Sequence, residues 1–218
     1  MGRVVTARSG YDEVLTFVKD FAATIAENRS YLTDLDSAIG DADHGTNLDR
    51  GMKAVEAKLE ESEGDDPGAL LKTVGMTLVS KVGGAGGPLY GTLFLQLGTK
   101  LAGADDIDLE RWAEAVDAAV TGVRARGKAE PGDKTMIDAL QPASDALKAA
   151  VGEGMSMEEA VQRAAAAAEE GMKATTPLVA RKGRASYLGE RSAGHQDPGA
   201  TSSFLLMQSA ARAFASKD

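Results

Sequence analysis

Apolar residues recur along this chain at intervals of three and four, and few stretches alternate apolar with polar residues. Near the N-terminus one helical face is formed by Val14, Val18, Phe21 and Ile25. Near the C-terminus a second face is formed by Phe204, Met207, Ala211 and Phe214. Because this spacing puts apolar side chains on one side of a helix, both segments are predicted to be amphipathic helices, and the fold class is all-α.

Cap and breaker residues divide the rest of the chain into further helices. Asp66-Pro67 and Asp108 are typical of helix starts, whereas Gly103 and Gly127 are typical of helix ends. Ser156 and Glu159 have the spacing of a capping box before an alanine-rich run over residues 160–168. We count about eight helices with short connections, so neighbouring helices should be antiparallel, within a single domain over residues 1–218.

Charge and composition exclude several functions. The net charge of -9 disfavours binding of nucleic acid, which usually requires a basic face. The chain has no cysteine, no recognisable signal segment and no long apolar stretch, so we expect a cytoplasmic protein with no disulfide and no membrane span. A phosphate ligand would therefore have to be bound by local features such as metal ions, helix N-termini or clustered basic residues.

The first of four glycine-rich interruptions runs over residues 36–47 and contains Asp36, Asp41 and Asp43. Carboxylates 4–5 Å apart repel by about 3–4 kcal/mol per pair at an effective dielectric near 20, so a hard cation is needed to hold them together. Mg²⁺ fits best, because the glycine and glutamate of a calcium-binding EF-hand are missing and zinc would need more nitrogen or sulfur ligands. The alternative is that Asp43 or Thr46 only caps the next helix.

The second and third interruptions are shorter. Residues 83–91 leave backbone amides open to a ligand before a helix that would start near Pro88, although a tight turn between helices explains the glycines equally well. Residues 132–136 resemble a phosphate loop but lack its spacing, because Asp133 stands before Lys134. There the alternative is a helix N-terminus capped by Asp133, with Lys134 solvated.

The fourth interruption, over residues 181–200, concentrates basic residues in an acidic protein. Arginines interleaved with glycines suit phosphate contacts, although a solvated basic loop is the alternative. Asp197-Pro198 is also typical of a helix start. Pro177 lies in a stretch that otherwise continues as helix, and it would kink the approach to Arg181.

Together the four segments resemble the nucleotide-binding L subunit of the dihydroxyacetone kinase family, from about Tyr11 to the C-terminus. The stretches that carry the resemblance are LDSAIGDADHGTNL, VGGAGGPLYGTLF, PGDKTMIDAL and ARKGRASYLGERSAGHQDPGA. The resemblance implies a barrel of eight antiparallel helices with the nucleotide site at one end. It also implies two Mg²⁺ ions held by Asp36, Asp41 and Asp43, with ADP or ATP as the nucleotide.

The resemblance further assigns nucleotide contacts to matching positions. These positions are His44, Gly45, Thr46, Asn47, Ala85, Gly86, Gly127, Met136, Arg184, Asp197, Pro198 and Gly199. The family often has glycine where this chain has Ala42 and serine where it has Gly86, so a hydroxyl that could contact phosphate is missing at Gly86. No catalytic residue is expected on this chain.

The implied activity is kinase activity shared between subunits. A separate K subunit would hold a small ketose, and ADP would stay bound as a coenzyme that a phosphohistidine subunit of the phosphotransferase system rephosphorylates. Two alternatives remain: an ATP-dependent ketose kinase subunit, and a subunit that reports its nucleotide state to a transcription regulator. A fatty-acid kinase nucleotide domain is disfavoured by His44, where that family usually has threonine.

Overall fold

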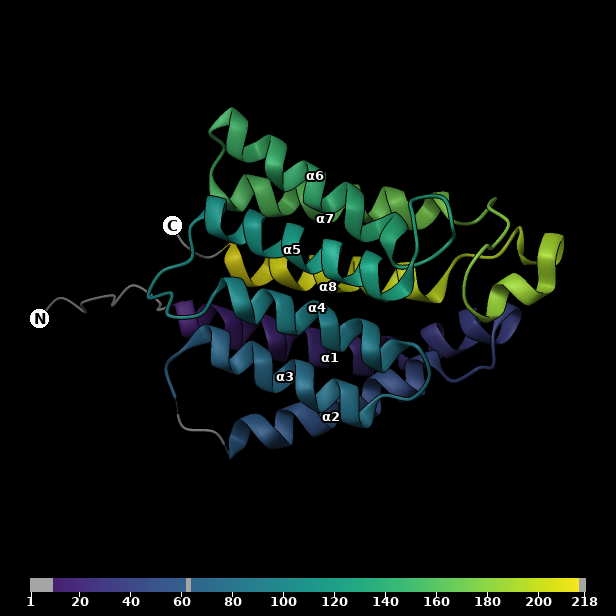
Figure 1. The fold of residues 1–218 in the computed structure, drawn as a ribbon, viewed down its shortest axis with the longest axis horizontal. Coiled ribbons are helices and arrows are strands. Elements are labelled where there is room, and N and C mark those ends of the chain that lie inside the picture. Colours follow the sequence, from purple (N-terminus) through teal and green to yellow (C-terminus); the bar gives the residue numbers. More distant parts are fainter. Residues whose placement is uncertain (1–9, 62–63, 216–218) are drawn as a thin grey trace, which may run out of the picture.

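The computed structural model describes residues 10–61 and 64–215, and every regular element in those ranges is helical. The elements are α1 (Gly10–Ile39), α2 (His44–Glu60), α3 (Pro67–Lys81), α4 (Gly86–Lys100), α5 (Leu109–Gly127), α6 (Ile137–Glu153), α7 (Met157–Ala174), the 3₁₀ segment η1 (Arg184–Ser192) and α8 (Pro198–Phe214). The all-α prediction and the count of about eight helices are confirmed (Figure 1).

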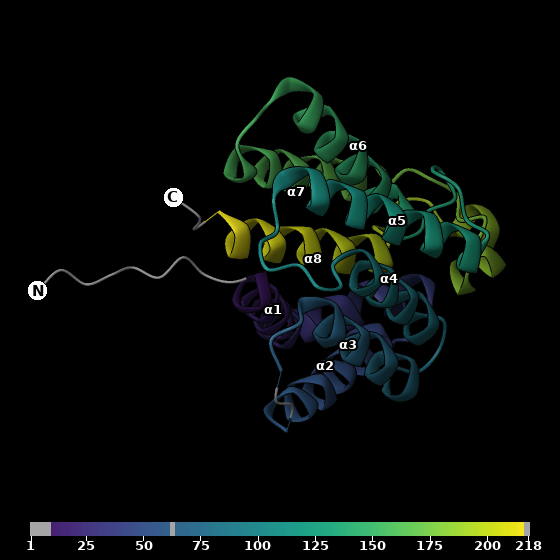
Figure 2. The same cartoon turned by 60° about the vertical axis from the view of Figure 1, so that its left-hand side comes forward.

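The eight α-helices close into a barrel. Each helix from α1 to α7 packs against the next one in the chain, and α8 packs against both α7 and α1 (Figure 2). Most connections are short and make sequential neighbours antiparallel, as predicted, because a helix that returns at once must run the opposite way. The α7–α8 connection, over residues 175–197, is longer than predicted. The first and last helices therefore lie side by side, and groups far apart in sequence can meet at either end.

A continuous apolar core fills the barrel. The predicted face of α1 is fully buried, and Phe17 and Phe21 on this helix contact aromatic rings of α4, including Phe94. Trp112 of α5 and Phe214 of α8 pack with ring centroids 4.5 Å apart. Aromatic pairs at such distances add to the stability gained from burying the rings themselves, so these contacts tie opposite helices together.

The cap signals are confirmed where a polar side chain stands next to the helix that it begins. Asp66 accepts hydrogen bonds from the N–H groups of Gly68 and Ala69, and Asp108 accepts one from Arg111. Ser156 and Glu159 form the complete capping box of α7. The helix before Gly103 ends slightly earlier than predicted, at Lys100.

Two further points concern the ends of helices. Pro177 does not kink a helix, because α7 already ends at Ala174, and that prediction is wrong. In the described part of the chain, no helix combines the length and the apolar character that crossing a bilayer would require.

Candidate functional site

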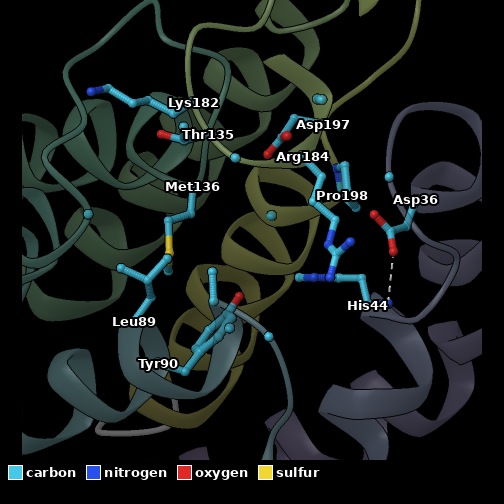
Figure 3. A pocket seen from close by; sticks show the side chains of 18 of the residues that line it. Asp36, His44, Leu89, Tyr90, Thr135, Met136, Lys182, Arg184, Asp197 and Pro198 are labelled. Atoms are coloured by element: carbon cyan, nitrogen blue, oxygen red, sulfur yellow. Dashed lines mark hydrogen bonds between the residues drawn. The ribbon is translucent and has the colours of Figure 1, made fainter. Parts of the chain in front are cut away.

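A cavity of about 490 Å³ lies at one end of the barrel, where the α1–α2, α3–α4, α5–α6 and α7–α8 connections come together. All four glycine-rich interruptions contribute to its wall (Figure 3). Of the fifteen residues that the sequence assigned to metal or nucleotide, thirteen line this cavity, and Gly45 and Thr46 do not. A volume of this size is in the range of small-molecule sites.

Three carboxylates gather on one side of the cavity, in what we call the aspartate loop (residues 36–43). One oxygen each of Asp36, Asp41 and Asp43 lies within 4.8 Å of the others. The sequence treated all three as loop residues, but Asp36 lies in the last turn of α1 and is buried. The long helix α1 thus carries one carboxylate to the other two.

Asp36 also orders the loop that follows it. Its Oδ2 accepts hydrogen bonds from the backbone N–H groups of Asp43 (2.8 Å) and His44 (3.1 Å). Asp43 is the residue before α2, but its side chain makes no capping bond, so the simple capping alternative is wrong for it. Ala42 adopts a left-handed φ of 61°, a conformation that costs a residue with a side chain about 1 kcal/mol relative to glycine.

The donor set of the aspartate loop fits Mg²⁺. All three candidate ligands are carboxylate oxygens, which hard divalent cations prefer, and they lie close enough together to share one or two ions. The only cation that pairs with the loop in the described part of the chain is Arg184, whose Nη2 lies 3.0 Å from Asp41 Oδ2. One guanidinium balances only part of the charge of three clustered carboxylates.

His44 begins α2 and connects the aspartate loop to the last helix. Its Nε2 lies 2.9 Å from Ser202 Oγ, and Tyr90 donates its hydroxyl hydrogen to the same Ser202 oxygen at 2.7 Å. Burial lowers the pKa of His44, whereas the carboxylates of Asp36 and Asp43 act in the opposite direction. Burial raises the pKa of Tyr90 to about 12, so this phenol stays protonated and acts as a donor.

The glycine-rich connection between α3 and α4 forms another part of the wall. Helix α4 begins at Gly86, close to the start predicted from Pro88, and Ala85 and Gly86 both line the cavity. Gly84 has a φ of 64°, and a side chain on Gly87 would collide with the Val82 carbonyl. The glycines therefore serve the turn and leave the first N–H groups of α4 near the cavity.

The connection between α5 and α6 differs from its expected structure. Asp133 does not cap a helix: its carboxylate accepts a hydrogen bond from Glu130 N–H, and α6 begins only at Ile137. Lys134 is not solvated, because only 1% of its surface is exposed. Met136 lies next to Leu89 of α4, and the two side chains form an apolar wall in Figure 3.

The connection between α7 and α8 carries what we call the basic segment (residues 181–191). Its larger part is the 3₁₀ segment η1, which the sequence described only as a loop. Arg184 begins η1, points into the cavity and pairs with Asp41, so the basic and acidic walls touch at this point (Figure 3).

Asp197 stands at the start of α8 and is buried. Its side chain caps the helix by accepting a hydrogen bond from Ala200 N–H at 2.7 Å, as its sequence position predicted. Burial raises the pKa of Asp197 to about 7, and the Ala200 N–H and the Lys134 ammonium act against that rise. Pro198 and Gly199 follow on the cavity wall.

Sequence reasoning missed several residues of the cavity. Tyr90, Leu89 and Lys134 line it, and Ser202, which is not among the lining residues, lies within hydrogen-bond distance of His44. Tyr90 and Ser202 sit on regular helices and gave no local signal. Lys134 lies two residues before the assigned Met136, and a solvated side chain was one alternative for it because its partners are distant in sequence.

Gly45 has a packing role. A side chain there would collide with the Arg29 carbonyl of α1, so the glycine lets α2 approach α1 closely. This close approach brings the start of α2 to the aspartate loop, and the N–H groups of the first turn have no carbonyl to bond within the helix.

Comparison with known proteins adds to this geometry. Residues 38–212 match the DAK2 domain family. The chain is 46% identical, over 89% of its length and 91% of the relative, to the ADP-binding subunit DhaL of the PEP-dependent dihydroxyacetone kinase of Escherichia coli. It is 41% identical, over 90% of its length and 94% of the relative, to the ADP-binding subunit DhaL of the PTS-dependent enzyme of Lactococcus lactis.

A solved structure shares the fold. The dihydroxyacetone kinase from C. freundii, in complex with AMP-PNP and Mg²⁺, superposes with a TM-score of 0.67 at 27% identity. The match covers 97% of this chain and 36% of that longer chain. The barrel described here thus corresponds to about a third of that kinase.

Proposed function

Because this chain belongs to the DAK2 domain family, we propose that it is the ADP-binding subunit of a dihydroxyacetone kinase that depends on phosphoenolpyruvate. The observation that carries the proposal is the convergence of three carboxylates, an arginine and glycine-rich backbone on one cavity. The names of the DhaL relatives, which match nearly full-length, support both the nucleotide and the phosphoryl source.

The aspartate loop would hold two Mg²⁺ ions through Asp36, Asp41 and Asp43. Bound there, the ions would neutralise phosphate oxygens, which is the main chemical help that phosphoryl transfer needs. The N–H groups at the start of α2, after His44, would face the same phosphates, since a helix N-terminus favours anions. Arg184 would exchange its contact with Asp41 for a phosphate contact.

The other walls would hold the rest of the nucleotide. The apolar surface of Leu89 and Met136 suits a nucleobase, whereas Ala85 and Gly86 offer backbone N–H groups. Gly127, at the end of α5, also lines the cavity, and a side chain there would lie 3.3 Å from Leu89. No side chain of this subunit is needed as a general base, because the accepting hydroxyl belongs to a ketose held by a K subunit.

The direct test is reconstitution with a K subunit and dihydroxyacetone. We expect turnover when a phosphohistidine donor, charged from phosphoenolpyruvate, is present with a catalytic amount of ADP. We expect no sustained turnover with excess ATP alone. Steady turnover with ATP at about 1–100 per second, the usual range of kinases, would contradict the coenzyme role and favour the ATP-dependent alternative.

The regulatory alternative needs a separate experiment, because it would leave the nucleotide site unchanged. A pull-down with the chain as bait, once with ADP and once with ATP, tests for nucleotide-dependent capture of a transcription regulator. An Asp43→Ala variant, expected to be impaired in Mg²⁺ binding, is the matched control. The regulatory role would be supported if capture depends on the nucleotide with the unmodified chain but not with the Asp43→Ala variant.

A further inference from the structure

Among the residues that were not assigned to metal or nucleotide, the most unusual side chain is that of Lys134. This lysine is buried between α6 and the α7–α8 connection, with 1% of its surface exposed and a left-handed φ of 63°. Burying an ammonium group is costly unless other groups replace its water shell. A lysine kept in such a place therefore has strong partners.

Those partners are backbone carbonyl oxygens. The ammonium donates to Ser192 O at 2.8 Å, Thr175 O at 2.9 Å and Leu178 O at 3.0 Å. It also contacts the carbonyls of Thr176 and His195. Five acceptors surround three N–H donors, and in the described part of the chain no carboxylate lies within ion-pair distance of this group.

The carbonyls come from the two ends of one stretch of chain. Residues 175–178 follow α7, residues 192–195 precede α8, and the basic segment with Arg184 lies between them. Three other hydrogen bonds hold the same ends in place. Gly194 N–H to Thr176 O and Ala180 N–H to Ser192 Oγ join one end to the other, and Arg181 N–H to Asp133 O joins the stretch to the residue before Lys134. The ammonium of Lys134 thus lies at the centre of a ring of carbonyls, those of residues 175, 176, 178, 192 and 195, which come from both ends of the stretch.

We propose that Lys134 is a positioning residue whose ammonium sets where Arg184 and Asp197 stand in the nucleotide site. The inference rests on the proposed function, since it assigns a role in ADP binding to a group that need not touch ADP. Arg184 lies six residues after Leu178, and Asp197 lies two after His195, so a shift of the ring moves both. Burial lowers the pKa of Lys134, and the Asp197 carboxylate acts in the opposite direction.

The first experiment replaces Lys134 by methionine, which keeps the length and removes the charge. We expect the affinity for ADP with Mg²⁺ to fall by about 10- to 100-fold, because small displacements of positioning groups have effects of that size. Helix content, measured by circular dichroism, should not change. Lys173→Met, which removes an exposed lysine paired with glutamates of α7, is the matched control and should bind ADP like the unmodified chain.

Limited trypsin digestion tests the position of the segment without any nucleotide. Arg181, Lys182, Arg184 and Arg191 are cleavage sites inside the stretch that Lys134 closes. Lys134→Met should speed cleavage at these sites about tenfold or more, since proteolysis follows the population of the open form. Arg184→Ala should weaken ADP binding without speeding cleavage at the other three sites.

Chemical rescue separates charge from packing. In a Lys134→Ala variant, propylammonium should restore ADP affinity, whereas propanol, of similar size but neutral, should not. If the methionine or alanine variant fails to fold, Lys134→Gln decides, because it keeps two N–H donors without the charge. Lost affinity together with faster cleavage, at intact helix content, supports the proposal.

The proposal is overturned if Lys134→Met binds ADP within about twofold of the unmodified chain. It is also overturned if affinity falls while cleavage is unchanged, or if propanol rescues as well as propylammonium. An unmodified chain that does not bind ADP contradicts the proposed function instead. In that case the trypsin result still decides whether Lys134 holds the segment.

Discussion

The aspartate loop and the basic segment meet at the same cavity, but they are held in place differently. The aspartate loop is ordered by a neighbour in sequence, since Asp36 binds the N–H groups of residues 43 and 44. The basic segment is ordered from a distance, since Lys134 lies more than 40 residues before the carbonyls that it binds. A local turn suffices for one wall, and the other requires the folded barrel.

The two walls also differ in charge balance. The basic segment carries its own cations, whereas the aspartate loop gathers three carboxylates around a single contact from Arg184. The negative charge of the acidic wall is therefore not balanced without added cations, whereas the basic wall needs no added cation. We expect the nucleotide phosphates to bind between them, and the predictions below test each side of this difference.

The largest effect should follow removal of divalent cations. We expect ADP affinity to fall by more than about 100-fold in EDTA, because at least two charge-assisted phosphate contacts of about 1.5–3 kcal/mol each are lost. Calorimetric titration with ADP, with and without Mg²⁺, measures this. Equal affinities in the two buffers would show that the aspartate loop needs no cation. The difference in charge balance between the acidic and basic walls would then have no effect on ADP binding.

A second prediction concerns Asp197, the residue that caps α8. Its pKa of about 7 in the folded chain lies above the ordinary value of 3.8. The folded chain therefore holds a proton that the unfolded chain has released between these pH values. The free energy of unfolding should fall as pH rises from about 4 to about 7, by up to about 4 kcal/mol from this group, and then level off.

Asp197→Asn keeps an oxygen that can cap α8 and removes the titration. Urea unfolding in EDTA, from pH 4 to pH 8, should give the variant a flatter dependence than the unmodified chain. The difference between the two curves isolates Asp197 from the other carboxylates. Parallel curves over this range would mean that Asp197 keeps an ordinary pKa.

The smallest effect is expected for Arg184→Ala. Loss of one arginine–phosphate contact should reduce ADP binding by about 1.5–3 kcal/mol, or roughly 10- to 150-fold. Arg111→Ala, at an exposed position in the first turn of α5, is the matched control and should change binding by a few tenths of a kcal/mol at most. Equal affinities for the two variants would favour the alternative that the basic segment is a solvated loop without a phosphate contact.

How far the sequence predicted these features depended on the distance between interacting residues. The buried face of α1 and the caps at Asp66, Asp108 and Ser156 were predicted because each depends on neighbours within one or two helical turns. The alternative of a solvated Lys134 was wrong because the partners of this lysine lie in the distant α7–α8 connection. The alternative of a capping Asp133 was wrong although its partner is close, because the carboxylate accepts from Glu130 N–H before it and from no N–H of α6 after it.

The site shows the same limit. Asp36 was found through the spacing of three carboxylates, whereas His44 and Asp197 were assigned to the nucleotide through a family resemblance. The structure brings all three to one cavity. Tyr90 and Ser202 were missed, because a tyrosine and a serine inside regular helices have no local pattern that sets them apart from core or surface residues. Only closure of the barrel brings Ser202 to His44 and Tyr90 to Ser202.

The contact between His44 and Ser202 joins residues 158 positions apart. A ribosome adds residues one by one, from the N-terminus, so the aspartate loop emerges long before α8 does. Until α8 is made, His44 lacks its serine partner. Lys134 lacks the carbonyls of Ser192 and His195 until the residues just before α8 are made. Nascent chains that stop before α8 should therefore not retain ADP, and nucleotide capture becomes a late event in the synthesis of this protein.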